Sequence, residues 1–382
     1  MKAKNNKNVV FLTNILPPYR LAVFQLLTKH FSKFKILLST QSEGNRDWEV
    51  SSDGIDVEVQ RNMTLTGHNK HSSGFKEDGA IHIPFNTITK LYELRPDVIV
   101  SAELGLRTLF STFYKLLNPG VRFIVYADLS EYTESSRGLL RYLIRKFILR
   151  YSDSVIVNGE AGRRYINNKL KYKGNVYKIP YPSDKIFLDN FKEKKIISNG
   201  SMSKLNLQIL YVGQLIPRKG LIQFIDVLSS YIENKDICIK FVLVGDGELK
   251  KKISSIKEKN LIISCVGHVG YDELFKYYLE SDISVLPTLA DTWALVVNES
   301  MSCGVPVLGS KYSQAIEEMV QHGVNGWIYD PMLKGDLYKV LDHIVVKDLA
   351  KLDKISFEAY SRAKQISAEV VAKAMIIALD SN

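Results

Sequence analysis

The chain contains little cysteine and no pattern that would use it. Its 382 residues include three cysteines, Cys238, Cys265 and Cys303, which show neither CxxC spacing nor nearby histidines. An odd number without such spacing excludes a disulfide scaffold and a structural zinc motif. We therefore expect three free thiols in a reducing compartment.

Long hydrophobic runs are also absent. The basic first residues are followed by a short apolar run, Val9 to Leu12, which is too short for the core of a signal peptide. No other run approaches the roughly 18 residues that cross a bilayer. We expect a cytoplasmic protein, and peripheral attachment to the inner face of the cytoplasmic membrane stays open.

Internal repeats and compositional bias are missing too, but the charge is uneven. Apolar residues make up 46% and charged residues 24%, as in ordinary globular proteins. The net charge of +10 arises in residues 1–180, which contain 27 Lys and Arg against 16 Asp and Glu. This suits an anionic partner: nucleic acid, an acidic membrane surface or a phosphorylated substrate. Aromatic platforms interleaved with basic residues are missing, so we expect no nucleic acid.

Short β-branched runs alternate with segments of helical period in both halves of the chain. This alternation is typical of βαβ units around a parallel sheet and predicts an α/β fold. A helix is predicted over Pro17–Phe31, where apolar residues recur at helical spacing after two prolines. The expected strands are 8–13, 34–39, 97–100, 121–127, 154–157, 208–212, 240–244, 261–266, 283–287 and 305–308.

The length of the chain indicates two domains, because it exceeds what one hydrophobic core supports. The alternation stops in a polar segment, and we take residues 181–206 as a linker. It separates an N-terminal Rossmann-like domain, residues 1–180, from a C-terminal one, residues 207–359. A last helix, about residues 360–382, is expected to pack back onto the first domain. The prediction is two doubly wound domains facing a central cleft, where a ligand binds.

The first motif is a basic turn directly after a predicted strand, Gly213 to Gly220. Such a turn points free backbone N–H groups and the positive end of the next helix at an anion. Arg218 and Lys219 add two full charges. The arginine can bind phosphate oxygens bidentately and the lysine supplies a mobile point charge, so the pair suits a diphosphate. Taken alone, the pair is equally explained as a solvated basic turn.

A second turn, residues 244–248, resembles part of a dinucleotide-binding motif. Lys250 stands where GxGxxG needs its third glycine, and the first strand leads into Asn14 to Pro18 without any glycine. The fingerprint of an NAD-binding domain is therefore missing, and a dehydrogenase is disfavoured.

Two carboxylates, Asp291 and Glu299, flank a third strand-to-helix boundary. A carboxylate accepts two hydroxyl hydrogen bonds at once, so both suit the diols of a sugar or a ribose. Each also has a plain structural explanation: a helix N-cap for Asp291 and a helix surface charge for Glu299. The chain contains no Asp-x-Asp pair, a common metal-bridging arrangement.

The order of the motifs is more specific than any one of them. In the second half they are, in order, Arg218-Lys219-Gly220, Gly245-Asp246-Gly247, Gly267-His268-Val269, Ser281 to Pro287, Asp291 to Glu299, Gly304 to Val307 and Gly323 to Gly326. This set resembles the C-terminal domain of glycosyltransferase family 4, a family with the GT-B fold. The resemblance is dense from about residue 208 to 328, and in the first half it is looser and rests on residues 13–20.

This resemblance implies transfer of a sugar from a nucleotide diphosphate sugar with retention, and without a metal or other cofactor. UDP-sugars are favoured as donors, with GDP-sugars as the alternative. It implies that Arg218 and Lys219 hold the diphosphate, Glu299 the ribose and Asp291 a sugar hydroxyl, with Arg218, Lys219 and Asp291 as the catalytic set. Further donor-binding residues implied by it are Gly213, then His268 and Val269 beside the base, and Trp293, Ala294, Leu295 and Val296 beside the sugar or its phosphate, with Gly213 given no particular part of the donor.

Three positions depart from the family pattern. Asp291 stands where the family most often has glutamate, Ala294 where it has glycine, and Ser300 where it has alanine. These departures leave a second interpretation open, in which the protein binds a nucleotide sugar without turnover.

The acceptor is expected on the N-terminal domain, as a glycan or lipid-linked glycan in the synthesis of a surface polysaccharide (capsule, O-antigen or exopolysaccharide). Residues 137–150 place Arg137, Arg141 and Arg145 four apart, which suits a helix lying on an anionic membrane surface. A domain helix whose arginine stems cover its apolar edge explains the pattern equally well. Candidate acceptor residues are Pro18, Tyr19, Arg20, Glu103 and Asp128.

Overall fold

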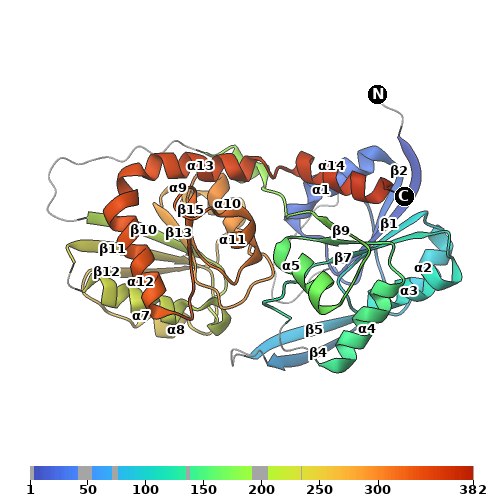
Figure 1. Ribbon diagram of the computed structural model, residues 1–382, viewed down its shortest axis with the longest axis horizontal. Helices are drawn as coiled ribbons and strands as arrows, with labels where there is room; N and C mark the ends of the chain where they lie inside the picture. Colours follow the sequence, from blue (N-terminus) through green and yellow to red (C-terminus); the bar gives the residue numbers. More distant parts are fainter. Residues whose placement is uncertain are drawn as a thin grey trace. The chain divides into compact units, whose positions relative to one another are not determined.

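The computed structural model describes residues 4–41, 54–70, 76–134, 138–191, 205–233 and 235–381. They belong to two compact units, one made of residues 1–182 with 368–382 and the other of residues 183–367 (Figure 1). Each unit is built on one parallel sheet, as the alternation of runs in the sequence predicts.

The N-terminal unit holds a seven-stranded sheet in the order β3-β2-β1-β6-β7-β8-β9. All its neighbouring strands are parallel. The order reverses between β1 and β6, so the carboxyl ends of these two strands form the topological switch point. The strands are β1 (Asn5–Thr13), β2 (Phe31–Leu38), β3 (Asp56–Val59), β6 (Val98–Ala102), β7 (Arg122–Ala127), β8 (Ser154–Val157) and β9 (Asn175–Lys178).

Helices cover both faces of this sheet. On one face, Val10, Phe123 and Val155 belong to a hydrophobic cluster that also contains side chains of α2, α3, α4 and η1. On the other face Phe11 contacts Phe24 of α1, with ring centroids 5.0 Å apart, and α14 packs against α1 (Figure 1). The helices are α1 (Pro18–His30), α2 (Thr87–Leu94), α3 (Leu106–Leu117), α4 (Leu139–Arg150), α5 (Glu160–Arg164), η1 (Tyr165–Lys169) and α14 (Ala368–Asp380).

The C-terminal unit holds a six-stranded parallel sheet in the order β12-β11-β10-β13-β14-β15, whose switch point lies between β10 and β13. Its strands are β10 (Leu205–Val212), β11 (Ile237–Val244), β12 (Leu261–Gly267), β13 (Ile283–Leu286), β14 (Val307–Ser310) and β15 (Gly326–Tyr329). Its helices are α6 (Lys185–Leu188), η2 (Pro217–Lys219), α7 (Leu221–Ile232), α8 (Lys250–Ser254), α9 (Leu274–Leu279), α10 (Val296–Ser302), α11 (Gln314–Met319), α12 (Lys334–His343), η3 (Ile344–Asp348), η4 (Leu349–Lys351) and α13 (Leu352–Lys364).

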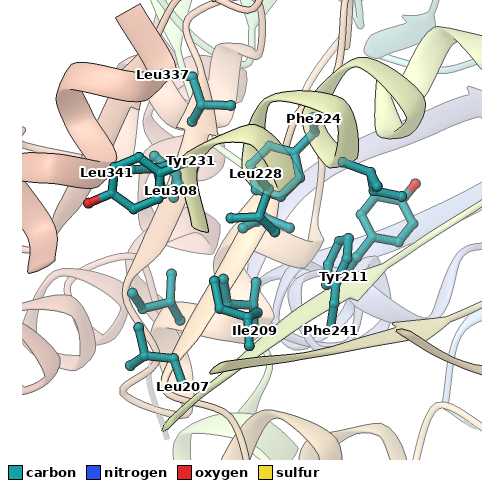
Figure 2. Packing of buried hydrophobic residues seen from close by; sticks show 14 of the residues in the cluster. Leu207, Ile209, Tyr211, Phe224, Leu228, Tyr231, Phe241, Leu308, Leu337 and Leu341 are labelled. Carbon is teal, nitrogen blue, oxygen red and sulfur yellow. The ribbon is translucent and has the colours of Figure 1, made fainter. Parts of the chain in front are cut away.

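The main core of this unit lies between the sheet and α7 with α12. Phe224 and Leu228 of α7 face Ile209 and Tyr211 of β10, as Figure 2 shows. All four side chains are buried, so helix and sheet remove a continuous apolar surface from water. A second cluster covers the opposite face of the sheet, so the sheet is doubly wound as predicted.

The predicted linker differs from the structure. Residues 183–191 belong to the C-terminal unit, because Phe187 of α6 is fully buried in the second cluster with Leu210, Val242 and Cys303. The unit also runs to Ser367, so α13 belongs to it and only α14 returns to the N-terminal unit. The remainder of the predicted linker, residues 192–204, lies outside the described residues.

Five strands were missed. β4 (Asn62–Lys70) and β5 (Lys76–Pro84) form an antiparallel hairpin, and β3, β9 and β15 are short strands. β3, β4 and β5 are rich in polar residues and β9 and β15 contain four residues each, so none of them shows the apolar run on which the prediction relied.

Candidate functional site

The basic turn and the two-carboxylate segment meet at the switch point of the C-terminal sheet, because they follow β10 and β13 directly. Gly220 allows the close approach: its φ is +66°, and a Cβ there would collide with the carbonyl oxygen of Pro287. The Leu289 N–H donates to the Arg218 carbonyl at 2.8 Å and joins the two loops. Open α/β sheets bind ligands at this edge.

Three charged side chains meet at this edge. Asp291 Oδ2 lies 2.5 Å from Lys219 Nζ and 3.6 Å from Arg218 Nη1. The side chains of Arg218, Lys219 and Asp291 are 20%, 14% and 13% exposed, so the cluster is screened only in part. Burial alone would raise the pKa of Asp291, but the charges of Lys219 and Arg218 lower it. The carboxyl is therefore ionised at neutral pH.

Two cations against one carboxylate leave positive charge at a partly open sheet edge. Arg218 Nη1 also donates to the Ala290 carbonyl at 3.0 Å, which fixes its position. The sequence analysis assigned the cations and Asp291 to different parts of one donor, and the structure brings the three together. Asp291 is not an N-cap, since α10 begins at Val296 with Leu295 as its cap.

Glu299 lies inside the unit, and its explanation as a surface charge is wrong. Its side chain on α10 is 8% exposed, and the Tyr278 hydroxyl donates to its Oε2 at 2.9 Å. Burial raises the pKa of Glu299 to about 7, against the lowering effect of the Tyr278 hydrogen bond and with help from the charge of Asp184. A buried carboxyl with a pKa near neutrality suits a functional site.

The loop before α10 contains a strained residue. Ala294 has a φ of +76°, in the left-handed region that glycine adopts at little cost. The backbone thus keeps a glycine-like conformation although the side chain is a methyl group. Trp293 is buried and donates from Nε1 to Asn298 Oδ1 at 2.8 Å, so its ring packs inside the unit. Its carbonyl accepts from Ser313 Oγ at 2.7 Å, and its contact with a sugar stays a prediction.

The remaining predicted donor residues lie in neighbouring loops. The Gly213 N–H donates to the Val244 carbonyl at 2.9 Å, which ties the end of β10 to that of β11. His268 is exposed in the loop after β12, and Val269 packs against the cluster that contains Tyr278. Their contact with a base stays a prediction.

The predicted acceptor residues form two groups at the carboxyl edge of the N-terminal sheet. In the first, Arg20 Nη2 donates to the Tyr181 hydroxyl at 2.7 Å, and that hydroxyl donates to Asp128 Oδ2 at 2.5 Å. Arg20 is 8% exposed, and its guanidinium lies over the Tyr126 ring at 4.5 Å. Tyr19 packs edge-on against Tyr181, with centroids 5.1 Å apart. Arg20 is therefore a structural residue here, next to Pro18 at the start of α1.

Glu103 belongs to the second group, at the β1–β6 switch point. It has a φ of +67°, and its Oε1 accepts from Asn14 Nδ2 at 2.8 Å. Asn14 Oδ1 in turn accepts from the buried Arg107 at 2.6 Å, and Arg107 also donates to Ser39. Strained backbones of this kind cluster at functional sites, so Glu103 stays a candidate.

Arg145 of the predicted arginine stripe, residues 137–150, does not face solvent. Arg145 is 7% exposed, its Nη1 lies 2.6 Å from Glu134 Oε2, and it donates to the Tyr165 hydroxyl at 2.8 Å. Arg141 is half-buried on the same side of α4, and Arg137 lies outside the described residues. Arg145 therefore holds α4 to the domain.

Sequence reasoning missed the residues that surround Glu299. Asp184 caps α6 by accepting from the Ile186 N–H at 3.1 Å, and it also accepts from the Tyr271 hydroxyl at 3.0 Å. Asp184, Glu299, Tyr271 and Tyr278 thus form a cluster of two carboxylates and two phenols. A Ser-Asp pair before an apolar run is a helix-start signal that could have identified Asp184.

Neither a metal cluster nor a membrane span was found. Within the part of the chain that the structure describes, no three His, Cys, Asp or Glu side chains gather to hold a metal ion. Over the same residues, no helix is long and apolar enough to cross a membrane.

Comparison with known proteins identifies relatives of both units. Residues 192–361 match the family model of Glycosyl transferases group 1. The chain is 28% identical over 209 residues to the uncharacterized glycosyltransferase MJ1178 of Methanocaldococcus jannaschii, covering 54% of each protein. It is 28% identical over 151 residues to the putative teichuronic acid biosynthesis glycosyltransferase TuaC of Bacillus subtilis, covering 35% of this chain and 36% of that protein. The alignments thus span about half or less of these curated relatives.

Solved structures extend the similarity to the whole chain. The Anabaena protein Alr3699/HepE in complex with UDP has a TM-score of 0.71 at 18% identity, covering 98% of this chain and 100% of that one. This confirms the predicted fold class, two Rossmann-like domains as in GT-B proteins. The matched segment and the curated relatives support the glycosyltransferase superfamily, with the match to the group 1 model confined to residues 192–361.

Proposed function

We propose that the protein transfers a sugar from a nucleotide diphosphate sugar, with a UDP-sugar as the first choice and a GDP-sugar as the second. The observation that carries the proposal is the cluster of Arg218, Lys219 and Asp291 at the switch point of the C-terminal sheet. A diphosphate needs cations on a preorganised loop, and a group 1 domain supplies the context. The complexes of the Anabaena protein with UDP and UDP-glucose support UDP as the nucleotide.

The chemistry we propose is electrostatic. When the bond between the anomeric carbon and the diphosphate breaks, negative charge develops on the departing phosphate oxygen. Lys219 and Arg218 stabilise that charge more in the transition state than in the bound donor. Asp291 competes for the same cations in the free protein, and we assign it to a sugar hydroxyl when the donor is bound.

Retention follows from a front-face reaction in this proposal. The acceptor hydroxyl attacks from the side that the diphosphate leaves, and the leaving phosphate oxygen takes the acceptor proton. No protein base and no metal ion are then required. We place the reaction on a glycan or lipid-linked glycan in surface polysaccharide synthesis, which the similarity to a putative teichuronic acid biosynthesis enzyme supports.

One observation favours a second candidate, a protein that binds a nucleotide sugar without turnover. Ala294 keeps a left-handed backbone at a cost that glycine would avoid. Its methyl group lies in the loop assigned to the sugar, so it could have closed the site to a productive donor pose.

A turnover assay separates the two candidates. Purified protein is incubated with single UDP-sugars and GDP-sugars, with and without a chelator, and the released nucleoside diphosphate is measured. Release from one donor that survives the chelator and is lost in Lys219→Ala supports transfer without metal. Stabilisation by a nucleotide without any release, even when membranes of the source cells are added as acceptor, would leave only the binding role.

A further inference from the structure

The solvent-facing side of α3 and α4 is unusually apolar. On α4, Leu139 and Leu140 are each 73% exposed and Leu143 is 53% exposed. On α3, Phe113 and Leu116 are 41% exposed and Leu117 is 69% exposed. Single exposed leucines are ordinary, but six large exposed apolar side chains on two packed helices are typical of an interaction surface.

The two helices contribute to one surface. Phe113 of α3 and Phe147 of α4 have ring centroids 6.0 Å apart, which joins the exposed stripes. Residues 139, 143, 146 and 150 of α4 recur at spacings of four, three and four, so they share one side of the helix. Arg145 lies on the other side, bound to Glu134. The leucines, not the arginines predicted from the sequence, therefore face solvent.

A basic hollow continues this surface at the C-terminal end of α4. Lys146, Phe147 and Arg150 line a hollow of about 540 Å³ together with Lys171 and Lys173 of the loop before β9. Its one carboxylate, Asp153, already lies 3.0 Å from Lys115. Among the described residues no carboxylate pairs with Arg150, Lys171 or Lys173. The hollow thus presents four cations that can bind phosphate groups.

We infer that this α3–α4 surface docks the protein onto a bilayer that contains anionic lipid. Apolar side chains beside lysine and arginine are what an interfacial site needs: the leucines enter the headgroup region and the cations attract lipid phosphates. A soluble polyanion would use the hollow but would leave the leucines in water. The inference rests on the proposed function in one respect, that docking would bring a lipid-linked acceptor to the enzyme.

The test is flotation of the full chain with vesicles of phosphatidylcholine, alone or mixed with phosphatidylglycerol. We expect binding to the mixed vesicles that weakens as salt rises, and little binding to phosphatidylcholine alone. Leu140→Ser/Leu143→Ser should weaken binding at least about tenfold, because two leucines leave the interface. Arg150→Gln/Lys173→Gln should weaken it by about tenfold or more, since each cation contributes about fivefold.

Matched controls exist in the same unit. Ile377 on α14 is 62% exposed, and Lys33 on β2 is exposed, so Ile377→Ser and Lys33→Gln should bind like wild type. Wild-type binding in the leucine variant would overturn the inference, as would binding to soluble polyphosphate with no binding to vesicles. UDP-induced stabilisation is measured in parallel: its absence with intact vesicle binding would refute the donor site and leave the docking surface standing.

Discussion

The two sheets have the same kind of switch point but place different chemistry there. In the N-terminal unit the arginines near the carboxyl edge, Arg20 and Arg107, are buried and bound to protein groups. In the C-terminal unit Arg218 and Lys219 keep 20% and 14% of their side chains exposed and share one carboxylate. A cation already satisfied by the protein contributes to stability, and one left with excess charge at an open edge contributes to binding. This contrast supports our proposal that a diphosphate binds to the C-terminal unit.

The largest expected effect concerns stability in the N-terminal unit. Arg20→Ala removes a buried charge that bonds Tyr181 and stacks on Tyr126. We expect the free energy of unfolding of that unit to fall by about 3–5 kcal/mol, as when a buried charge loses its partner. Urea denaturation measures this, with Arg61→Ala as the exposed control. A loss of unfolding free energy no larger than that of Arg61→Ala would show that Arg20 is not a structural residue.

The next effect concerns Glu299, which is buried in the C-terminal unit. Its pKa is raised to about 7, so the folded state holds the proton more tightly than the unfolded chain does. The contribution of the protonated Glu299 carboxyl to the free energy of unfolding is fully present below the ordinary carboxyl pKa. It is lost as the pH rises through about 7. The free energy of unfolding of Glu299→Gln should therefore exceed that of wild type by up to about 3 kcal/mol at pH 8 and equal it near pH 4.

The same variant tests the ribose assignment. If ionised Glu299 accepts the ribose hydroxyls, wild-type affinity for UDP should fall about tenfold from pH 8 to pH 6. Glu299→Gln should bind more weakly and without this pH dependence. Calorimetric titrations at both pH values measure the affinity for UDP. The variant Glu258→Gln, at an exposed position, is the control. Equal pH profiles in all three proteins would remove Glu299 from the site.

Lys219→Ala tests the cations of the C-terminal unit. We expect the rate of sugar transfer to fall about 100-fold, as when one oxyanion donor is lost. Lys276→Ala removes an exposed lysine paired only with Glu273 and serves as the control. Rates are followed by release of the nucleoside diphosphate. Near-normal turnover in Lys219→Ala would contradict the mechanism.

The smallest effect concerns Ala294, whose φ of +76° carries strain. Ala294→Gly relieves about 1–2 kcal/mol of strain from the left-handed backbone. About half of that gain is offset, because glycine increases the conformational entropy of the unfolded chain. We expect a net stabilisation of up to about 1 kcal/mol, measured by denaturation. A gain in turnover in the same variant would show that the methyl group restricts the sugar loop, and lost stability would show that no strain was relieved.

The sequence predicted the C-terminal site better than the N-terminal one for a physical reason. Arg218, Lys219 and Asp291 lie in segments directly after strongly apolar strands, so their meeting at one sheet edge follows from chain order alone. The burial of Arg20 and Arg145 depends on Tyr181, Asp128, Glu134 and Tyr165, which are distant along the chain or on other elements. A pattern of charges along one helix could not show which side would turn inward.

The boundaries show the same limit. Residues 183–191 look polar enough for a linker, and only the burial of Phe187 among Leu210 and Cys303 reveals that they belong to a domain. Likewise, the spacing of Asp291 predicted a ligand contact but not its ion pair with Lys219.

The most direct test of the central claim is thermal stabilisation by nucleoside diphosphates in wild type and in Arg218→Ala/Lys219→Ala. The account predicts that UDP raises the melting temperature of wild type and has no effect on that of the double variant. The ligand-free double variant is expected to melt below wild type, because Asp291 loses both of its cations, so each shift is taken from the protein's own ligand-free value. An equal UDP shift in both proteins would contradict the assignment of the diphosphate to this cluster.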